Sequence, residues 1–432
     1  MSNVYQDLRN LEAEGEFVSI GLVGAGQMGT DIVSQVAQME GVRVPVVADI
    51  DLERAEKAYE LSGTSVDDVV NSDDVEEIDK YIKDGKSVVT KDGFLLPKLD
   101  NVDVIIDATG VPKVGARLGL STINHQKHIV MMNVEADVVV GPILKQMADN
   151  AGVVYTGAAG DEPGAIMEIY NFAKSMGYKV VAAGKGKNNP LDREANPEKV
   201  AERAERKGTA AHMMACFMDG TKSMLEMAAV SNATGLVPDV PGMHGPTTTV
   251  DELADVYSLK EQGGILNQEG IVDFALGDVA PGVFVVVTTD NDRVKFSMNY
   301  SKMGDGPNYL LYRPYHLASL ETPLSAVRAV LYHEATIAPK GDLVTEVTTI
   351  AKKDLKPGDE IDNIGGFAVY GSVDKIEVAR EKNLLPLGIA EGAKLKQEVK
   401  KGERLTLDMV ELDKDSVIYE LWQLQKRVFQ DK

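Results

Sequence analysis

The chain contains one cysteine, Cys216, in 432 residues. A single cysteine excludes an internal disulfide and any zinc site built from several cysteines. This usage fits a reducing compartment, and we expect a cytoplasmic protein. The first twenty residues contain acidic side chains but no apolar core, so they lack the pattern of a secretory signal peptide.

Basic side chains are also in short supply. Lysine and arginine number 45 against 67 aspartates and glutamates, which gives a formal net charge of -22. Nucleic acids and anionic membranes require clustered basic side chains, so we expect neither as a partner. No run of eighteen apolar residues occurs, so no membrane span is expected. The predicted partner is a small molecule.

What the chain does contain is a β-α-β pattern between Val18 and Asp51. An apolar run, 18–23, precedes a glycine-rich loop, and a helical pattern and a second apolar run ending at Asp49 follow it. The loop reads Gly24-Ala25-Gly26-Gln27-Met28-Gly29. Between two strands, with an acid about twenty residues further on, this spacing indicates dinucleotide binding.

Each glycine of this motif has its own role. Gly24 permits the tight turn, Gly26 lets the backbone approach a pyrophosphate, and Gly29 allows the helix to pack closely on the strand. Backbone N–H groups at the helix start, around Gln27 and Met28, hold the phosphate charge. The sequence therefore predicts a bound NAD or NADP.

The choice between the two cofactors stays open. The carboxylate of Asp49 can accept hydrogen bonds from the ribose hydroxyls and would repel the 2′-phosphate of NADP. Arg54 stands where a guanidinium could bind that phosphate. Asp51 is an equally good candidate for the cap of the following helix.

Strands and helices alternate from residue 18 to residue 156, which predicts a doubly wound parallel sheet of the Rossmann type. One predicted strand, 102–106, runs into a small turn that contains Thr109 and Gly110, where a nicotinamide ribose usually lies. A later strand, 128–132, ends before Asn133. We include Asn133 among the cofactor-binding residues.

Two acids open the helix that follows this sheet. Asp161 and Glu162 stand at a helix start, where carboxylates suit the helix dipole, and this is the expected role of at least one of them. The alternative is that they bind the substrate or a divalent metal ion.

A second domain begins near residue 157. A predicted strand, 179–183, leads into Gly184-Lys185-Gly186-Lys187, where two ammonium groups and backbone N–H groups could bind a phosphate or a charged polyol. Further along, Asp219, Lys222 and Glu226 would share one face of a helix. A partly buried Lys222 there could donate a proton to a developing alkoxide.

Later stretches are less specific. Arg313 and His316, in an Arg-Pro-Tyr-His run, form a candidate anion clamp. The segments 282–289 and 293–298 are predicted to be the strands of a hairpin. The segments 351–361 and 396–405 resemble each other and predict a strand-rich C-terminal domain, and 416–429 predicts an amphipathic helix.

In this order the motifs resemble the homoserine dehydrogenase-like oxidoreductases that carry a C-terminal SAF (antifreeze-like) domain. One branch of that group contains enzymes similar to 1-deoxy-D-xylulose 5-phosphate reductoisomerase. The resemblance covers nearly the whole chain. The motifs that carry it are VGAGQMG, DATGVP, MMNVEAD, GAAGDEPG, AAGKGK, DGTKSMLEMA and LYRPYHL.

The resemblance implies a fold and a reaction class. It implies a Rossmann domain at 1–156, an α+β catalytic and dimerisation domain at 157–342, and a small β-rich SAF-like domain at 343–432, in a homodimer. It implies that Lys185, Lys187 and Lys222 face the substrate.

The expected activity is the NAD(P)-dependent reduction of a carbonyl group in a small, phosphorylated polyhydroxy compound. Lys222 or Lys185 would protonate the alkoxide, with Asp219 one turn before Lys222 as in homoserine dehydrogenases. A divalent ion on Asp161 or Glu162 would serve a reductoisomerase. The alternatives are homoserine dehydrogenase itself and a dinucleotide-sensing protein without catalysis.

Overall fold

The structure is a computed structural model that describes residues 3–429. The chain forms two compact units: unit 1 consists of Met1–Asp161, Leu317–Ala338 and Ser416–Lys432, and unit 2 of Glu162–His316 and Pro339–Asp415. The end of the first long segment lies five residues beyond the expected boundary at residue 156. The other two segments of unit 1 come from parts of the sequence that were expected in later domains.

Unit 1 is built on a seven-stranded sheet with the order β3-β4-β2-β1-β5-β6-β7. All neighbouring strands are parallel, which confirms the predicted doubly wound Rossmann-type sheet. Its strands are β1 (Val18–Val23), β2 (Val42–Ala48), β3 (Val69–Asn71), β4 (Ser87–Thr90), β5 (Val104–Asp107), β6 (His128–Met131) and β7 (Tyr155–Gly157).

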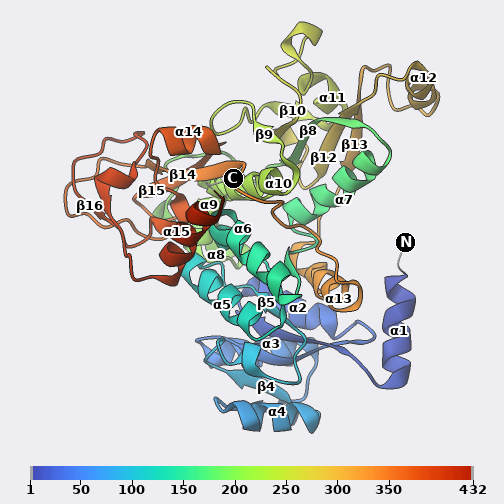
Figure 1. The fold of residues 1–432 in the computed structure, drawn as a ribbon, viewed down its shortest axis with the longest axis vertical. Helices are drawn as coiled ribbons and strands as arrows, with labels where there is room; N and C mark the ends of the chain where they lie inside the picture. Colours follow the sequence, from blue (N-terminus) through green and yellow to red (C-terminus); the bar gives the residue numbers. More distant parts are fainter. Residues whose placement is uncertain (1–2, 430–432) are drawn as a thin grey trace. The chain divides into compact units, whose positions relative to one another are not determined.

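Apolar side chains cover both faces of this sheet. Along β5, Val104 and Ile106 belong to one core cluster and Ile105 to another, because successive side chains of a strand point to opposite faces. Helices therefore pack on both sides (Figure 1). The helices of unit 1 are α1 (Val4–Glu14), α2 (Gln27–Val36), α3 (Leu52–Ser62), α4 (Val75–Lys83), α5 (Pro112–Asn124), α6 (Val134–Ala151), α13 (Thr322–Tyr332) and α15 (Val417–Phe429).

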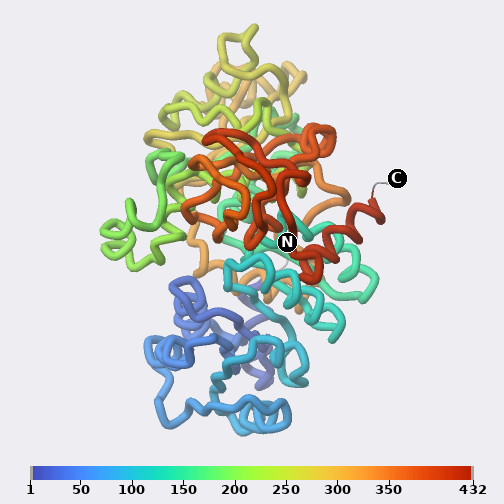
Figure 2. The backbone as a smooth tube through the Cα atoms, turned by 90° about the vertical axis from the view of Figure 1, so that its left-hand side faces the viewer, coloured from blue at the N-terminus to red at the C-terminus, as the bar shows by residue number. Residues whose placement is uncertain are grey.

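The C-terminal helix α15 belongs to unit 1, where it packs on α5 and α6 (dark red and teal in Figures 1 and 2). Its Gln425 side chain accepts a hydrogen bond from Ile143 N at 3.1 Å and donates one to Val139 O at 2.9 Å. These two backbone groups would normally bond to each other within α6, beside Pro142. Gln425 satisfies both, and this contact attaches the helix to a domain far away in sequence.

Unit 2 contains a mixed sheet with the order β10-β11-β8-β12-β13, and β9 pairs with β11. Its strands are β8 (Lys179–Gly186), β9 (Val237–Pro238), β10 (Thr247–Thr249), β11 (Ile271–Asp278), β12 (Val283–Thr288) and β13 (Asn308–Arg313). Its helices are α7 (Glu162–Ser175), α8 (Pro197–Lys207), α9 (Ala211–Asp219), α10 (Thr221–Thr234), α11 (Leu253–Val256), α12 (Asp292–Tyr300) and α14 (Ile376–Glu381).

The predicted hairpin at 282–298 is wrong in its second half. Residues 292–300 form the helix α12, because the Asn291 side chain accepts hydrogen bonds from Arg293 N and Val294 N and so caps a helix start. The antiparallel partner of β12 is β13, which comes later in the chain.

The tail module, residues 339–415, completes unit 2. Its strands are β14 (Thr345–Ala351), β15 (Val369–Lys375), β16 (Lys394–Leu395) and β17 (Val410–Glu411). The two similar segments seen in the sequence pair with each other: Leu355 N donates to Val399 O at 2.8 Å, and Val399 N donates to Leu355 O at 3.0 Å. Gly358 N likewise donates to Leu395 O, and Gly402 N to Ala351 O. The repeat is therefore a local pseudo-two-fold pair.

Candidate functional site

The glycine loop of unit 1 has the geometry that its spacing predicts. Gly24 has a φ of +100°, which is the left-handed region that glycine tolerates. A Cβ on Gly29 would lie 1.9 Å from Gly24 O, whereas a Cβ on Gly26 would meet nothing within 4 Å. Gly24 and Gly29 are thus needed for the fold of the loop itself, and Gly26 leaves open space at the start of α2.

The carboxylate of Asp49 lies at the end of β2 and binds this loop. It accepts hydrogen bonds from Ala25 N at 2.7 Å and from Asp51 N at 2.9 Å. Asp51 caps α3, as expected, and lies 3.2 Å from Arg54 Nε. Asp49 therefore has a structural role in the loop, and both it and Arg54 stay predictions as cofactor-binding residues.

A second polar network lies at the end of β5. Asp107 is fully buried and accepts hydrogen bonds from Thr109 N, Thr109 Oγ1 and Asn133 Nδ2 at 2.7–3.1 Å. Burial raises the pKa of Asp107 to about 6, against these hydrogen bonds. Asn133 also caps α6. The network fixes the turn that holds Thr109 and Gly110.

Unit 2 contains a buried cluster of charged groups around Lys185, which has 5% of its surface exposed. Its Nζ lies 2.5 Å from Glu162 Oε1 and also bonds to Glu226. Glu162 is the first residue of α7, Lys185 lies near the end of β8, and Glu226 lies on α10. Three elements, far apart in sequence, therefore supply one cation and two carboxylates.

Glycines on β8 make this arrangement possible. A Cβ on Gly184 would lie 2.3 Å from Asp273 O, and one on Gly186 would lie 2.3 Å from Ala280 N. Neighbouring backbone atoms thus leave no room for a side chain at either glycine. Lys185 and Lys187, two residues apart, share the other face of the extended chain. The strand runs to Gly186, three residues further than the sequence indicated.

The opposite charges of Lys185 and its two glutamate partners affect the pKa values in this cluster. Burial alone would lower the pKa of Lys185, but the carboxylates of Glu162 and Glu226 outweigh it and raise that pKa. Burial, together with the negative charge of Glu162, raises the pKa of Glu226. Lys185 is therefore held in its charged form.

Lys187 is in a different electrostatic situation. Its side chain is buried and Nζ donates a hydrogen bond to Phe217 O at 2.6 Å. Burial, and then the charge of Lys185, lower its pKa to about 8. An ammonium group with that pKa can give up a proton near neutral pH, which an ordinary surface lysine cannot do.

The two candidates from the Arg-Pro-Tyr-His run lie in different surroundings. His316 Nε2 is 3.6 Å from Glu162 Oε1 and so adjoins the cluster. Arg313 Nη1 lies 3.0 Å from Glu168 Oε2 on α7. The structure places His316 beside the Lys185 cluster and gives Arg313 an acidic partner, so an anion would compete with Glu168 for it.

The expected single helical face with Asp219, Lys222 and Glu226 is wrong. Gly220 has a φ of +86° and separates α9, which ends at Asp219, from α10, which begins at Thr221. Lys222 and Glu226 remain one turn apart on α10, and the positive charge of Lys222 acts on Glu226. Asp219 is fully buried and pairs with Lys352 of the tail module at 2.7 Å.

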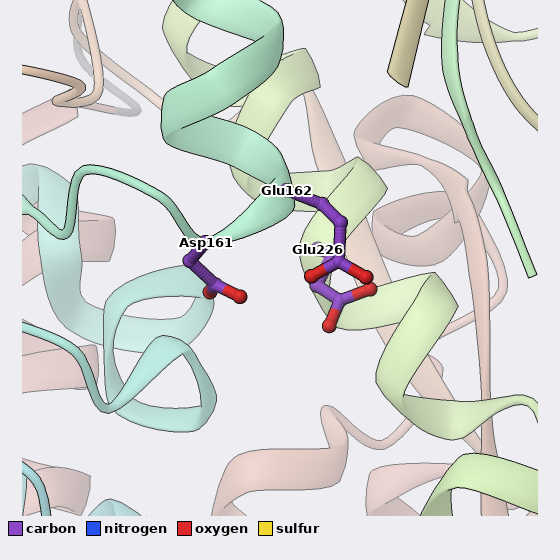
Figure 3. A group of neighbouring side chains, drawn as sticks. All are labelled: Asp161, Glu162 and Glu226. Atoms are coloured by element: carbon purple, nitrogen blue, oxygen red, sulfur yellow. The ribbon is translucent and has the colours of Figure 1, made fainter. Parts of the chain in front are cut away.

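Carboxylates that could hold a metal ion meet beside Lys185. Glu162 and Glu226 point towards each other from α7 and α10, and Asp161 directly precedes Glu162 (Figure 3). One oxygen of each lies within 4.8 Å of the other two. Such hard oxygen donors suit Mg²⁺ or Mn²⁺. The Lys185 ammonium group already contacts two of these carboxylates, those of Glu162 and Glu226.

Sequence reasoning did not assign two residues of this region. Glu226 was noticed only for its helical spacing, although an acid in the apolar run Met224-Leu225-Glu226-Met227 signals a buried carboxylate that needs a cation. Lys352 gave no signal, since it stands beside another lysine in a polar segment.

A model of the family described as the catalytic domain of the oxidoreductase DRL matches residues 160–322. That stretch contains all the residues of the cluster: Glu162, Lys185, Lys187, Lys222, Glu226 and His316. The match supports an oxidoreductase. No curated protein matches the chain in sequence.

Several solved structures overlap with the chain at low similarity. A probable dehydrogenase from Thermotoga maritima is 14% identical, with a TM-score of 0.42, over 75% of this chain and 90% of that one. An NAD-binding oxidoreductase from Klebsiella pneumoniae is 17% identical, with a TM-score of 0.30, over 42% and 45%. A DOX-P reductoisomerase in complex with NADPH, fosmidomycin and magnesium is 15% identical, with a TM-score of 0.34, over 49% and 58%. TM-scores this low establish no common function.

Within residues 3–429, no helix combines the length and the apolar character needed to cross a membrane. Two findings thus bear on function. Residues 160–322 are similar to an oxidoreductase catalytic domain, and unit 1 has the sheet and the glycine loop of a dinucleotide-binding domain.

Proposed function

We propose that this protein is an NAD(P)-dependent oxidoreductase that reduces the carbonyl group of a small, phosphorylated polyhydroxy compound. The observation that carries the proposal is the buried group of Lys185, Lys187, Glu162 and Glu226 within the region similar to an oxidoreductase catalytic domain. Buried ionisable groups with shifted pKa values are frequent at catalytic sites, because catalysis needs pKa values matched to the proton transfers of the reaction.

The dinucleotide is assigned to unit 1. The open position at Gly26, the start of α2 and the turn at Thr109 and Gly110 support pyrophosphate and nicotinamide ribose binding there. The cofactor supplies the hydride when bound, and the protein supplies orientation and electrostatics.

The lysines divide the remaining work. As the carbonyl carbon is reduced, its oxygen gains negative charge, which nearby ammonium groups stabilise. Lys185 keeps its proton because two carboxylates hold it, so it acts as a fixed positive charge. Lys187, with a pKa of about 8, is the better proton donor to the alkoxide. Lys222 and His316 are assigned to the anionic end of the substrate.

The finer form of the proposal is a reductoisomerase of the 1-deoxy-D-xylulose 5-phosphate type. Its support is the carboxylate set of Asp161, Glu162 and Glu226, whose oxygens fit a divalent ion. Asp161, Glu162 and Glu226 would hold such an ion, which would supply Lewis-acid stabilisation of negative charge on substrate oxygens.

The test is an absorbance assay with NADPH or NADH and a panel of ketose and aldose phosphates, with and without Mg²⁺ or Mn²⁺. Cofactor oxidation by a phosphorylated sugar is the expected result, and metal dependence would support the reductoisomerase form. Activity with homoserine alone, in the oxidative direction, would instead assign homoserine dehydrogenase. Cofactor binding without turnover on the whole panel would contradict the enzyme assignment in favour of a sensor.

A further inference from the structure

The helix α10 carries Lys222 and Glu226 of the candidate site, and the tail module contacts it at both ends. At the start of α10, Thr221 Oγ1 accepts a hydrogen bond from Gly371 N at 2.8 Å. Near its end, Asn232 Oδ1 accepts from Val344 N at 2.8 Å and from Thr345 N at 3.0 Å. Both side chains are buried, so these bonds are shielded from water.

The third contact is an ion pair. Lys352 Nζ lies 2.7 Å from Asp219 Oδ2, and the two side chains are 3% and 0% exposed. The remaining donor capacity of Lys352 is used by Ala195 O at 2.7 Å and Gly366 O at 2.8 Å. One carboxylate and two carbonyl oxygens of the protein thus surround the ammonium group, which fits a structural anchor.

Asp219 transmits this anchor to α10. Its Oδ1 accepts a hydrogen bond from Thr221 N at 2.8 Å, so one carboxylate binds the first residue of α10 with one oxygen and Lys352 with the other. Arg193 Nη1 adds a hydrogen bond to Asp219 O at 2.7 Å. Thr221 N, Lys352 and Arg193 thus all bind Asp219, the residue before the break at Gly220.

We propose that the tail module helps to build the substrate site, with Lys352 as a positioning residue. Lys352 holds Asp219, Asp219 holds the start of α10, and the position of α10 places Glu226 next to Lys185. Asp219 then has no direct role in proton transfer. This inference rests on the proposed function only for its catalytic consequence, since the anchoring of α10 can be measured without any turnover.

A buried ion pair need not stabilise the fold, because desolvation can cancel the attraction, and registry is its best-attested use. The charge balance of the cluster depends on where α10 lies, because Glu226 is one of the two carboxylates that hold Lys185. A small shift of α10 separates Glu226 from Lys185, while unit 1 keeps its glycine loop.

The test uses Lys352→Met and Lys352→Arg in the full chain, with Lys353→Met as the matched control. Lys353 is adjacent in sequence and exposed. We expect Lys352→Met to lower kcat by tenfold or more with little change in KM for the dinucleotide, Lys352→Arg to recover much of the loss, and Lys353→Met to behave as wild type. Hydrogen exchange in residues 221–234 should rise in Lys352→Met alone.

If Lys352→Met does not fold, the double variant Lys352→Met with Asp219→Asn removes both charges and keeps an oxygen for Thr221 N. It should regain the fold and still show the faster exchange in α10. Unchanged exchange in α10 in a folded variant overturns the inference. If the wild-type protein turns over no substrate but Lys352→Met shows the raised exchange in α10, the proposed function is overturned and the anchoring of α10 stands.

Discussion

The glycine loop of unit 1 and the lysine cluster of unit 2 are assembled in opposite ways. The loop is made by consecutive residues, Gly24 to Gly29, and its geometry depends on contacts among neighbours in the chain. The cluster joins Lys185 to Glu162 and Glu226, which lie 23 and 41 residues away. A local motif tolerates change elsewhere in the molecule, whereas a cluster of this kind depends on the whole packing of its domain.

The contrast extends to electrostatics. The glycine loop offers backbone dipoles at the start of α2 and needs no buried charge of its own. The cluster keeps several ionisable side chains out of water, among them Lys185, Glu162 and Glu226, whose opposite charges compensate one another. Loss of one member should therefore be far more costly in unit 2 than loss of one hydrogen bond in unit 1.

The largest effect is expected from Lys185→Met. Removal of the cation leaves two buried carboxylates facing each other, which should cost about 3–5 kcal/mol of stability. Turnover should fall by about 100- to 1000-fold, because a charge that stabilises the developing alkoxide is lost. The measurements are thermal unfolding and kcat, with dinucleotide affinity as the internal control.

Lys179→Met is the matched variant for this experiment. Lys179 lies on the same strand, β8, but is exposed and pairs with Asp290 at the surface. It should leave both stability and turnover close to the wild-type values, because an exposed ion pair contributes little. Equal losses in both variants would show that β8, and not the buried charge, is what matters.

The next effect separates two glycines of the loop. In Gly29→Ala the new Cβ would overlap with Gly24 O. The free energy of unfolding should therefore fall by about 1–3 kcal/mol. Dinucleotide affinity should fall by a matching factor, roughly 5- to 150-fold. Gly26→Ala meets no protein atom and should keep the unfolding temperature while it weakens binding. The readouts are calorimetry and NADPH fluorescence titration. Normal binding by Gly26→Ala would argue against a phosphate at this loop.

A pH profile tests Lys187. Its pKa is lowered to about 8, and the proposed donor is the protonated form, so activity is present below that pH and is lost as the pH rises through it. Beyond this point kcat/KM should fall about tenfold for each pH unit. Lys187→Met should have low activity and no such alkaline limb. A limb that persists in this variant belongs to another group.

The smallest effect is expected at Asp49. Because its carboxylate binds Ala25 N and Asp51 N, Asp49→Ala should loosen the loop and weaken both NADH and NADPH by a similar factor, about tenfold. Fluorescence titration with each cofactor measures the two affinities. Weaker NADH binding with stronger NADPH binding would instead show that Asp49 recognises the ribose.

Much of unit 1 was predictable because its signals are local. The apolar runs, the glycine spacing and the acid at the end of β2 all lie between residues 18 and 49, and they predicted the loop. The alternation of strands and helices from residue 18 to residue 156 predicted the parallel sheet. The helix α15 was predicted as a helix but expected in the C-terminal domain. Its packing on α5 and α6, together with the contact of Gln425 with the backbone of α6, assigns it to unit 1.

The site in unit 2 was predictable in composition but not in arrangement. The residue types around Lys185 and Lys187 indicated an anion-binding or catalytic site, and both lysines are buried. The helical phase of Asp219 and Lys222 could not be read from spacing, because Gly220 interrupts the helix between them. The hairpin at 282–298 failed for a similar reason, since a capping asparagine overrode the strand pattern.

The sequence by itself determined the Rossmann-type sheet, the glycine loop and the inventory of charged groups, since periodicity and glycine spacing act over a few residues. Only the tertiary structure decided which charges meet. It pairs Lys185 with Glu162 and Glu226, and Asp219 with Lys352. A buried charge is costly unless an opposite charge lies beside it, and that partner can come from any distance along the chain.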